Sequence, residues 1–283
     1  MIQTHRIQAV LLLSLGFAMT SLVGCSSDSS STSPIPNGPL RILVTNDDGV
    51  GAEGIDVIVE ALIENPNNEV TVCAPRVNRS GSADRTDCAT GEATQEMTQS
   101  GFPATAVDGC PADAVNYALD PANGLYGAGA LPHVVISGIN EGQNVSETIA
   151  TSISGTVGAA KTAARDHGIP ALASSQGSST GFPGAPPAAE YDYEAGVPFV
   201  LAWLAENRNA LAAGTVTTDT VDSINMPTCV TGEIRDQVEV PLATDPTGAL
   251  GVPQDCESEL EDPKDDVQAF LNGFTALSEV PAN

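Results

Sequence analysis

The sequence predicts an α/β protein built from successive βαβ units, and three observations support this prediction. Short runs of β-branched and apolar residues alternate with stretches in which apolar residues recur at helical spacing. Polar, glycine-containing motifs directly follow several of the short runs, where an open parallel sheet places its binding crevice. An apolar fraction of 41% is enough to bury a core, which excludes a chain that is disordered throughout.

The expected elements follow one another in alternating order along the chain. Their short apolar runs predict buried strands at residues 42–45, 69–74, 133–137, 171–174 and 223–226. Their helical spacing of apolar or small residues predicts helices near residues 54–64, 112–119, 152–167 and 194–207. The polar, threonine-rich residues 80–108 indicate an extended hairpin or a loop. After Met226 the pattern thins to Pro, Gly and acidic residues until 267–277, which predicts a loop-rich C-terminal segment.

The first 39 residues indicate targeting rather than fold. A basic residue and a short apolar run end in Leu-Val-Gly-Cys, so residues 1–24 resemble a lipoprotein signal peptide and Cys25 would become the lipidated N-terminus. The alternative is an ordinary secretory peptide. Residues 25–39 form a Ser/Pro-rich tether, and residues 40–283 form the folded domain. Ser26 after the cysteine favours the outer membrane, so we expect a periplasm-facing lipoprotein anchored to the membrane through Cys25.

Charge limits the partners. Ten basic and 36 acidic residues give a formal net charge of −26. Such a chain repels nucleic-acid backbones, so no duplex nucleic acid is expected as a partner. A substrate that carries phosphate would therefore need a cation or backbone N–H groups close to it.

The cysteines agree with an oxidising compartment. Cys73 lies in a predicted buried strand, where a small apolar thiol is common. The remaining cysteines form two local pairs, Cys88–Cys110 and Cys229–Cys256, and each would close a loop of about 20–30 residues worth roughly 3 kcal/mol. No cysteine or histidine spacing is typical of a zinc site.

Oxygen-bearing side chains gather after three of the predicted strands. Asp47 and Asp48 follow the first strand, Ser80 follows the second and Asn140 follows the third. Adjacent carboxylates repel each other unless a cation or water lies between them. Carboxylate, hydroxyl and amide oxygens suit one divalent ion, Mg²⁺, Mn²⁺ or Ca²⁺, rather than zinc or copper.

A small-residue helix is expected to begin at Ser154-Gly155-Thr156. Its N-terminus would form an anion cradle, which together with a metal indicates phosphoryl chemistry. Each motif also has a plain structural interpretation when taken alone. Asp47-Asp48-Gly49 and the residues before Ser80 could be turns, and Ser154 could be only a helix cap.

Taken in order, the segments NDDGV, APRVNRSG, SGINEGQN and SGTVGAAKTAA resemble the SurE family of stationary-phase survival nucleotidases. The resemblance spans about residues 40 to 278. It implies a Rossmann-like three-layer sandwich with a mostly parallel sheet, and a metal-dependent phosphatase acting on nucleoside 5′- and 3′-monophosphates. It implies metal ligation by Asp47, Asp48, Ser80 and Asn140. It also implies that Asn46 and Asn144 are catalytic residues that orient the phosphate, and that Ser154, Gly155 and Thr156 bind the phosphate.

The predicted reaction is metal-assisted hydrolysis, with Asp47 or Asp48 positioning the attacking water or taking its proton. The alternative is a lipid-anchored protein that binds nucleotide or metal without turnover. The resemblance also implies a homodimer or tetramer assembled through the C-terminal arm. Here that expectation is weakened by the acidic and divergent residues 228–262.

Overall fold

The computed structural model describes residues 38–88, 91–122, 124–126, 130–181, 190–248 and 250–283. The predicted signal peptide, Cys25 and nearly all of the tether lie outside the described residues. The described chain belongs to one compact unit, Ile35–Asn283. Within the described ranges, no helix is long and apolar enough to span a membrane.

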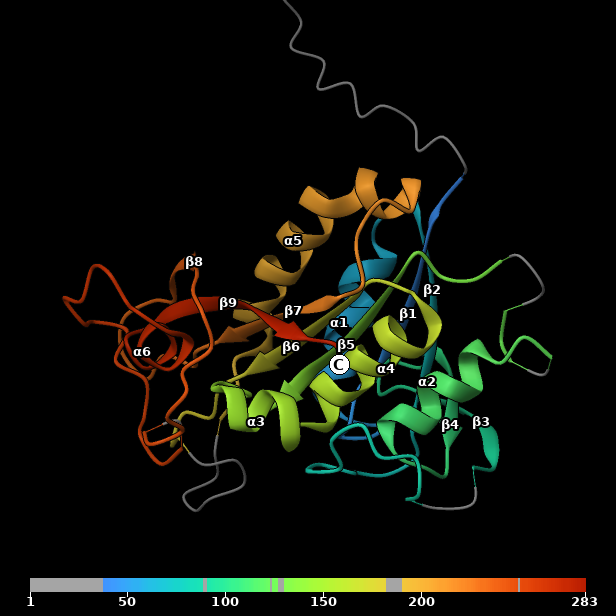
Figure 1. Cartoon of the computed structure of the whole chain (residues 1–283), viewed down its shortest axis with the longest axis horizontal. Coiled ribbons are helices and arrows are strands. Elements are labelled where there is room, and N and C mark those ends of the chain that lie inside the picture. Colours follow the sequence, from blue (N-terminus) through green and yellow to red (C-terminus); the bar gives the residue numbers. More distant parts are fainter. Residues whose placement is uncertain (1–37, 89–90, 123, 127–129, 182–189, 249) are drawn as a thin grey trace, which may run out of the picture. The chain divides into compact units, whose positions relative to one another are not determined.

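A nine-stranded mixed sheet runs through the described residues in the order β3-β4-β2-β1-β5-β6-β7-β9-β8 (Figure 1). The strands are β1 Leu40–Thr45, β2 Asn68–Pro75, β3 Ala93–Met97, β4 Pro103–Val107, β5 Val134–Glu141, β6 Ala171–Gln176, β7 Thr220–Met226, β8 Arg235–Glu239 and β9 Phe274–Pro281. The six strands from β4 to β7 are parallel to one another. β3 and β9 are antiparallel to their inner neighbours, and β8 is parallel to β9. The predicted α/β class with a mostly parallel sheet is confirmed.

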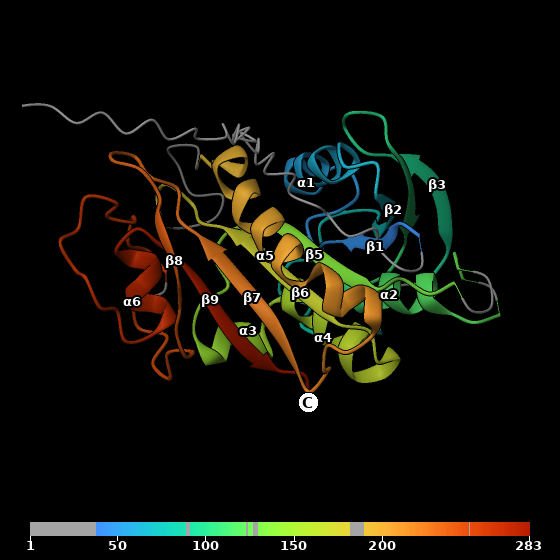
Figure 2. The same ribbon diagram turned by 90° about the horizontal axis from the view of Figure 1, so that it is seen from above.

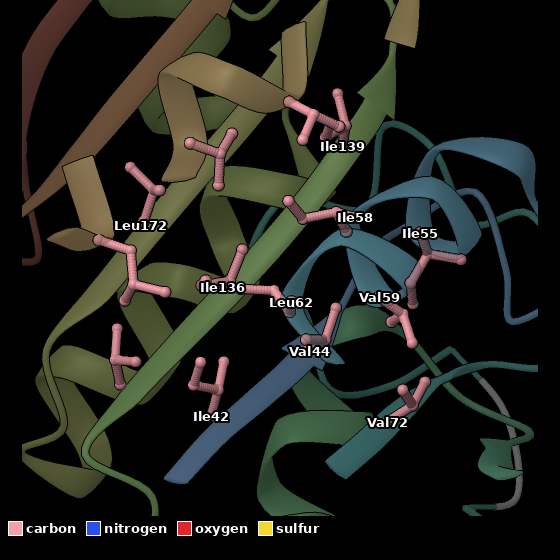
Figure 3. Packing of buried hydrophobic residues seen from close by; sticks show 14 of the residues in the cluster. Ile42, Val44, Ile55, Ile58, Val59, Leu62, Val72, Ile136, Ile139 and Leu172 are labelled. Carbon is pink, nitrogen blue, oxygen red and sulfur yellow. The ribbon is translucent and has the colours of Figure 1, made fainter. Parts of the chain in front are cut away.

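Helices cover both faces of the sheet and produce the three layers. They are α1 Glu53–Ile63, α2 Pro111–Leu119, α3 Glu147–Ser152, α4 Gly155–His167, α5 Tyr193–Ala213 and α6 Asp266–Leu271. α1 and α5 lie on one face of the sheet, whereas α2 and α4 lie on the other (Figure 2). Alternation along the strands explains this division: Ile42 and Val44 pack towards α1, and Leu43 between them packs towards α2 and α4. Figure 3 shows the α1 side, where Ile55, Ile58 and Leu62 meet the strands.

Elements that were not predicted accompany the expected ones. The helix expected near 152–167 is α4, which begins after Ser154 as the Ser154-Gly155-Thr156 sequence indicates; Ser154 caps it through Val157 N to Ser154 Oγ at 3.1 Å. The short helix α3, which ends at Ser152, was not predicted. Between β7 and α6 the described residues form one short strand, β8, and otherwise loops and turns, as expected, and α6 and β9 follow. β9 is inserted between β7 and β8, a long-range pairing that no local pattern encodes. The residues 80–108, expected as hairpin or loop, contain the β3–β4 hairpin.

Both predicted cysteine pairs are bonded in the structure. Cys88 is joined to Cys110 and Cys229 to Cys256, while Cys73 is a buried free thiol. The first bond closes a 22-residue separation and fixes the start of α2, whose N-cap is Cys110. The second closes a 27-residue separation and ties the acidic C-terminal segment to itself.

Candidate active site

The candidate site lies at the carboxyl ends of the central strands. β1 pairs with β2 on one side and with β5 on the other, so the order of the sheet reverses at β1. A crevice forms outside the strand ends at such a switch point. The chain after β1 supplies Asp47 and Asp48, the chain after β2 supplies Ser80, and the end of β5 supplies Asn140.

Asp47 is buried and lies on the N-terminus of α4. Thr156 Oγ1 donates to Asp47 Oδ1 at 2.6 Å, and the backbone N–H groups of Gly155 and Thr156 donate to the same carboxylate. Burial raises the pKa of Asp47, and these hydrogen bonds oppose the rise. The N-terminus of α4, which the sequence predicts as an anion site, thus binds the carboxylate of Asp47 in this structure. That contact fixes the position of Asp47.

Asp48 points to the other side of the crevice and is half-buried. The backbone N–H of Glu141 donates to Asp48 Oδ2 at 2.8 Å, and the amide of Asn78 donates to Oδ1 at 3.3 Å. Burial first, and then the charge of Asp47, raise the pKa of Asp48 to about 8, although a hydrogen bond from Ser80 opposes the rise. The hydrogen bonds from the protein therefore do not fully stabilise the ionised form of Asp48. A bound cation would stabilise the carboxylate and lower its pKa.

Asn140 follows an irregularity near the carboxyl end of β5. The register of β5 against β6 shifts between Ser137 and Asn140, as in a β-bulge, and bulges commonly redirect a side chain at a site. Gly138 within the bulge has φ +131, and a Cβ there would lie 2.2 Å from the carbonyl oxygen of Ser174. The Asn140 amide nitrogen donates to Gly142 O at 2.5 Å, so the side chain would offer its oxygen to a cation.

Asn46 and Asn144 serve as supports in this structure. The Asn46 amide bonds to both the carbonyl and the N–H of Gly49, which holds the tight turn that carries the two aspartates. Asn144 donates to Thr156 Oγ1 at 3.4 Å and to Ser175 Oγ at 2.9 Å. Its backbone N–H donates to the Asn225 side chain at 2.7 Å. Asn144 therefore contacts Asp47 only through Thr156.

Ser82 and the close packing of Gly155 are features that the sequence reasoning missed. Ser82 is 6% exposed, and its hydroxyl has no hydrogen-bond partner in the described chain. A Cβ on Gly155 would lie 2.8 Å from Ser82 Oγ, from Asp47 Cβ and from Asp47 Oδ2, so only glycine allows α4 to approach this closely. Ser82 follows Ser80 by two positions, so the sequence does place a second hydroxyl close to the predicted site.

A hollow at the opposite edge of the sheet contains none of the predicted site residues. It is lined in part by Arg41, His133 and Leu211, together with Gly168 and Gly214 at the C-terminal ends of α4 and α5. Helix C-termini present carbonyl groups and disfavour anions. This hollow is therefore a poor candidate for a phosphate site.

The residues at the crevice fit a hard divalent cation. In the described part of the chain, no three His, Cys, Asp or Glu side chains are grouped as a metal site. The predicted set contains only two carboxylates, Asp47 and Asp48, with neutral oxygens from Ser80 and Asn140. An all-oxygen donor set with an uncompensated Asp48 is the chemistry that Mg²⁺ or Mn²⁺ prefers.

Comparison with known proteins places these features in a family. A family model described as "Survival protein SurE" matches residues 42–244. Proteins named 5′-nucleotidase SurE are similar in sequence: that of Methanopyrus kandleri is 41% identical over 141 residues, 48% of this chain and 49% of the relative. That of Archaeoglobus fulgidus is 40% identical over 135 residues, 47% of this chain and 48% of the relative. The chain thus spans about half the length of the curated relatives that it matches.

One solved structure supports the fold. The crystal structure of the SurE protein from Aquifex aeolicus superposes with a TM-score of 0.62 and 24% sequence identity, covering 86% of this chain and 94% of that chain. At this identity the likeness concerns the fold alone. The three-layer α/β arrangement described above is the arrangement that the two proteins share.

Proposed function

The chain belongs to the SurE family, and from this premise we propose that it is a divalent-metal-dependent phosphatase that hydrolyses nucleoside 5′- and 3′-monophosphates. The relatives that share about half their length with it are named 5′-nucleotidases. The observation that carries the proposal is the pair of adjacent aspartates at the switch point, one of which has its pKa raised to about 8. The hydrogen bonds to this pair come from uncharged groups, including the Thr156 hydroxyl, the Asn78 amide and the backbone N–H of Glu141. Among the described residues, neither aspartate forms a salt bridge.

In the proposed reaction, each group of the chain has one task. A bound divalent ion would neutralise phosphate charge and lower the pKa of a water. Asp47, held by Thr156 and the start of α4, provides a fixed carboxylate. Asp48 is half-buried and nearer to solvent, so it is the carboxylate that orients the attacking water. Ser80 and Asn140 add neutral oxygens, and Asn144 keeps Thr156 in place.

Phosphate release from AMP tests this proposal. With Mn²⁺ or Mg²⁺ present, residues 26–283 should release many equivalents of phosphate per protein chain. Excess EDTA should abolish the release, because only the metal supplies the activated water and charge neutralisation. A burst limited to one equivalent would instead support a protein that binds nucleotide without turnover. Turnover that persists in EDTA would contradict a metal-dependent mechanism.

We also propose that the protein is exported and anchored to the outer membrane through a lipid on Cys25. The support is the Leu-Val-Gly-Cys sequence that ends a short apolar run and is followed by a Ser/Pro-rich stretch. Cys25→Ala should abolish metabolic labelling with palmitate and leave AMP hydrolysis by the folded unit unchanged, since a Ser/Pro-rich stretch separates the two in the sequence. Labelling that persists in Cys25→Ala would refute the anchor.

A further inference from the structure

Two tyrosines stack on each other beside the candidate site. The chain has only four tyrosines and one tryptophan. The rings of Tyr191 and Tyr193 lie 5.8 Å apart between centroids, with an interplanar angle of 18°. This offset-parallel geometry is one of the arrangements that aromatic rings favour.

The pair lies at the same edge of the sheet as the aspartates. Tyr193 begins α5, which starts at the carboxyl end of the sheet after β6. A Cβ on Gly54 would lie 2.9 Å from Tyr193 Cε1 and 1.9 Å from the carbonyl oxygen of Ile139, so Tyr193 packs next to the residue that precedes Asn140. Burial, and then the charges of Asp48 and Glu141, raise the pKa of Tyr193. The phenol is therefore close to the Asp48 side of the crevice.

The two rings differ in exposure. Tyr193 is 6% exposed and belongs to the core on the α1 and α5 face. Tyr191 packs against the same core but is only partly buried. The inner ring is thus held by packing, and it sets the plane of an outer ring that retains accessible surface. A ring fixed in this way loses little conformational freedom when it binds a second planar group.

We propose that Tyr191, backed by Tyr193, is the stacking platform for the nucleobase of the substrate. This inference rests on the proposed function and deepens it, because it assigns the base-binding side of the same crevice. In a nucleoside monophosphate only the ribose separates base and phosphate, so a phosphate held near Asp47 and Asp48 places the base over a neighbouring wall. Every base has a π-face, so stacking on tyrosine binds purines and pyrimidines without hydrogen-bond readout.

The platform should act on binding rather than on the chemical step. The base lies away from the reacting phosphorus and is bound equally in the ground state and the transition state. An interaction of that kind changes KM and leaves kcat unchanged. It also makes no contribution to a phosphomonoester that has no base.

The experiment compares AMP with ribose 5-phosphate in the metal-loaded protein. Tyr191→Leu keeps an apolar side chain against the core, and we expect it to raise KM for AMP about tenfold with kcat within about twofold. KM for ribose 5-phosphate should not change, and Tyr191→Phe should restore KM for AMP because its ring stacks equally well. Tyr117→Leu is the matched control, since Tyr117 is a partly buried tyrosine in α2 on the opposite face of the sheet. It should leave both KM values unchanged.

Each other outcome decides against the platform. An equal rise in KM for both substrates would show a structural effect of Tyr191, and an unchanged KM for AMP would show that the base does not stack there. Calorimetry with adenosine separates this inference from the proposed function. If the protein hydrolyses neither substrate, the phosphatase proposal fails, while adenosine binding that weakens about tenfold in Tyr191→Leu still supports the platform. Adenosine binding that is absent, or equal in both forms, overturns it.

Discussion

Asp48→Asn is expected to lower kcat for AMP by at least about a hundredfold, because carboxylate oxygens supply most of the binding electrostatics of a hard divalent ion. Asp47 and Asp48 are the two carboxylates of the predicted ligand set, and Ser80 and Asn140 are neutral. Removal of one charge should weaken Mn²⁺ binding as measured by calorimetry. Asp236→Asn, which changes an exposed aspartate on edge strand β8, is the control and should bind Mn²⁺ and turn over AMP as the unmodified protein does.

The same substitution should have the opposite effect on the stability of the metal-free protein. The pKa of Asp48 is raised to about 8 in the folded state, mainly by burial and the charge of Asp47, and in the unfolded state it is about 4. The folded state therefore favours the protonated carboxyl, so ionisation of Asp48 progressively lowers stability as pH rises from about 4 to about 8. Asparagine removes this loss, and we expect Tm in EDTA at pH 8 to rise by about 2 °C or more.

A pH series distinguishes this explanation from a general change in packing. The difference in Tm between Asp48→Asn and the unmodified protein should be largest at pH 8 and should shrink towards pH 4. Near-normal AMP turnover in Asp48→Asn would end the assignment of Asp48 to the site. A lower Tm for the variant in EDTA at pH 8 would contradict the proposed electrostatic cost.

Gly158→Ala should reduce both stability and activity, although alanine favours helices. A Cβ at position 158 would lie 2.1 Å from the carbonyl oxygen of Ala83 and 2.6 Å from the backbone nitrogen of Asp84. Those atoms are backbone, so α4 or the loop that follows Ser80 must move. We expect a loss of about 1–3 kcal/mol, or about 2–10 °C in Tm. The shift of the loop should also lower kcat about tenfold or more, since small displacements at a site have large effects.

Gly51→Ala is the matched control for this prediction. Gly51 lies in the turn before α1, its φ is not in the left-handed region, and no atom lies within 4 Å of a Cβ built there. Its stability should change by less than about 0.5 kcal/mol. If Gly158→Ala matches Gly51→Ala in thermal denaturation and in AMP turnover, close packing of α4 against the Ala83 loop is not required.

The parts of the fold that could be predicted are those whose cause is local. β1, β2, β5, β6 and β7 have apolar runs because both of their faces are covered, and periodicity detects such runs. The start of α4 was predicted because Ser154 is a good helix-start residue, whereas the six-residue helix α3 is too short to give a periodic pattern. β9 was missed because its position between β7 and β8 depends on partners about 40 to 60 residues earlier in the chain.

The candidate site shows the same division. Convergence of Asp48 with Asn78 and Glu141 follows from the rule that parallel strands end at one edge, and the structure does bring these groups together. The contact between Asp47 and the start of α4 depends on how closely the helix approaches β1. That approach is set by Gly155, whose missing side chain gives no pattern in the sequence. The sequence therefore predicted that the N-terminus of α4 binds a phosphate, but it did not show that Asp47 accepts hydrogen bonds there.

The contact between Asp47 and the N-terminus of α4 affects how a divalent ion would enter and leave the proposed site. Asp47, a proposed metal ligand, is already oriented by the Thr156 hydroxyl and two backbone N–H groups. Binding of an ion would therefore require no rearrangement of this side chain. Loading then depends mainly on how readily an ion sheds its water, and Mg²⁺ dehydrates reluctantly. Under the export proposed above, the protein would take the divalent ion that its surroundings supply, and its activity would follow the mineral content of the medium.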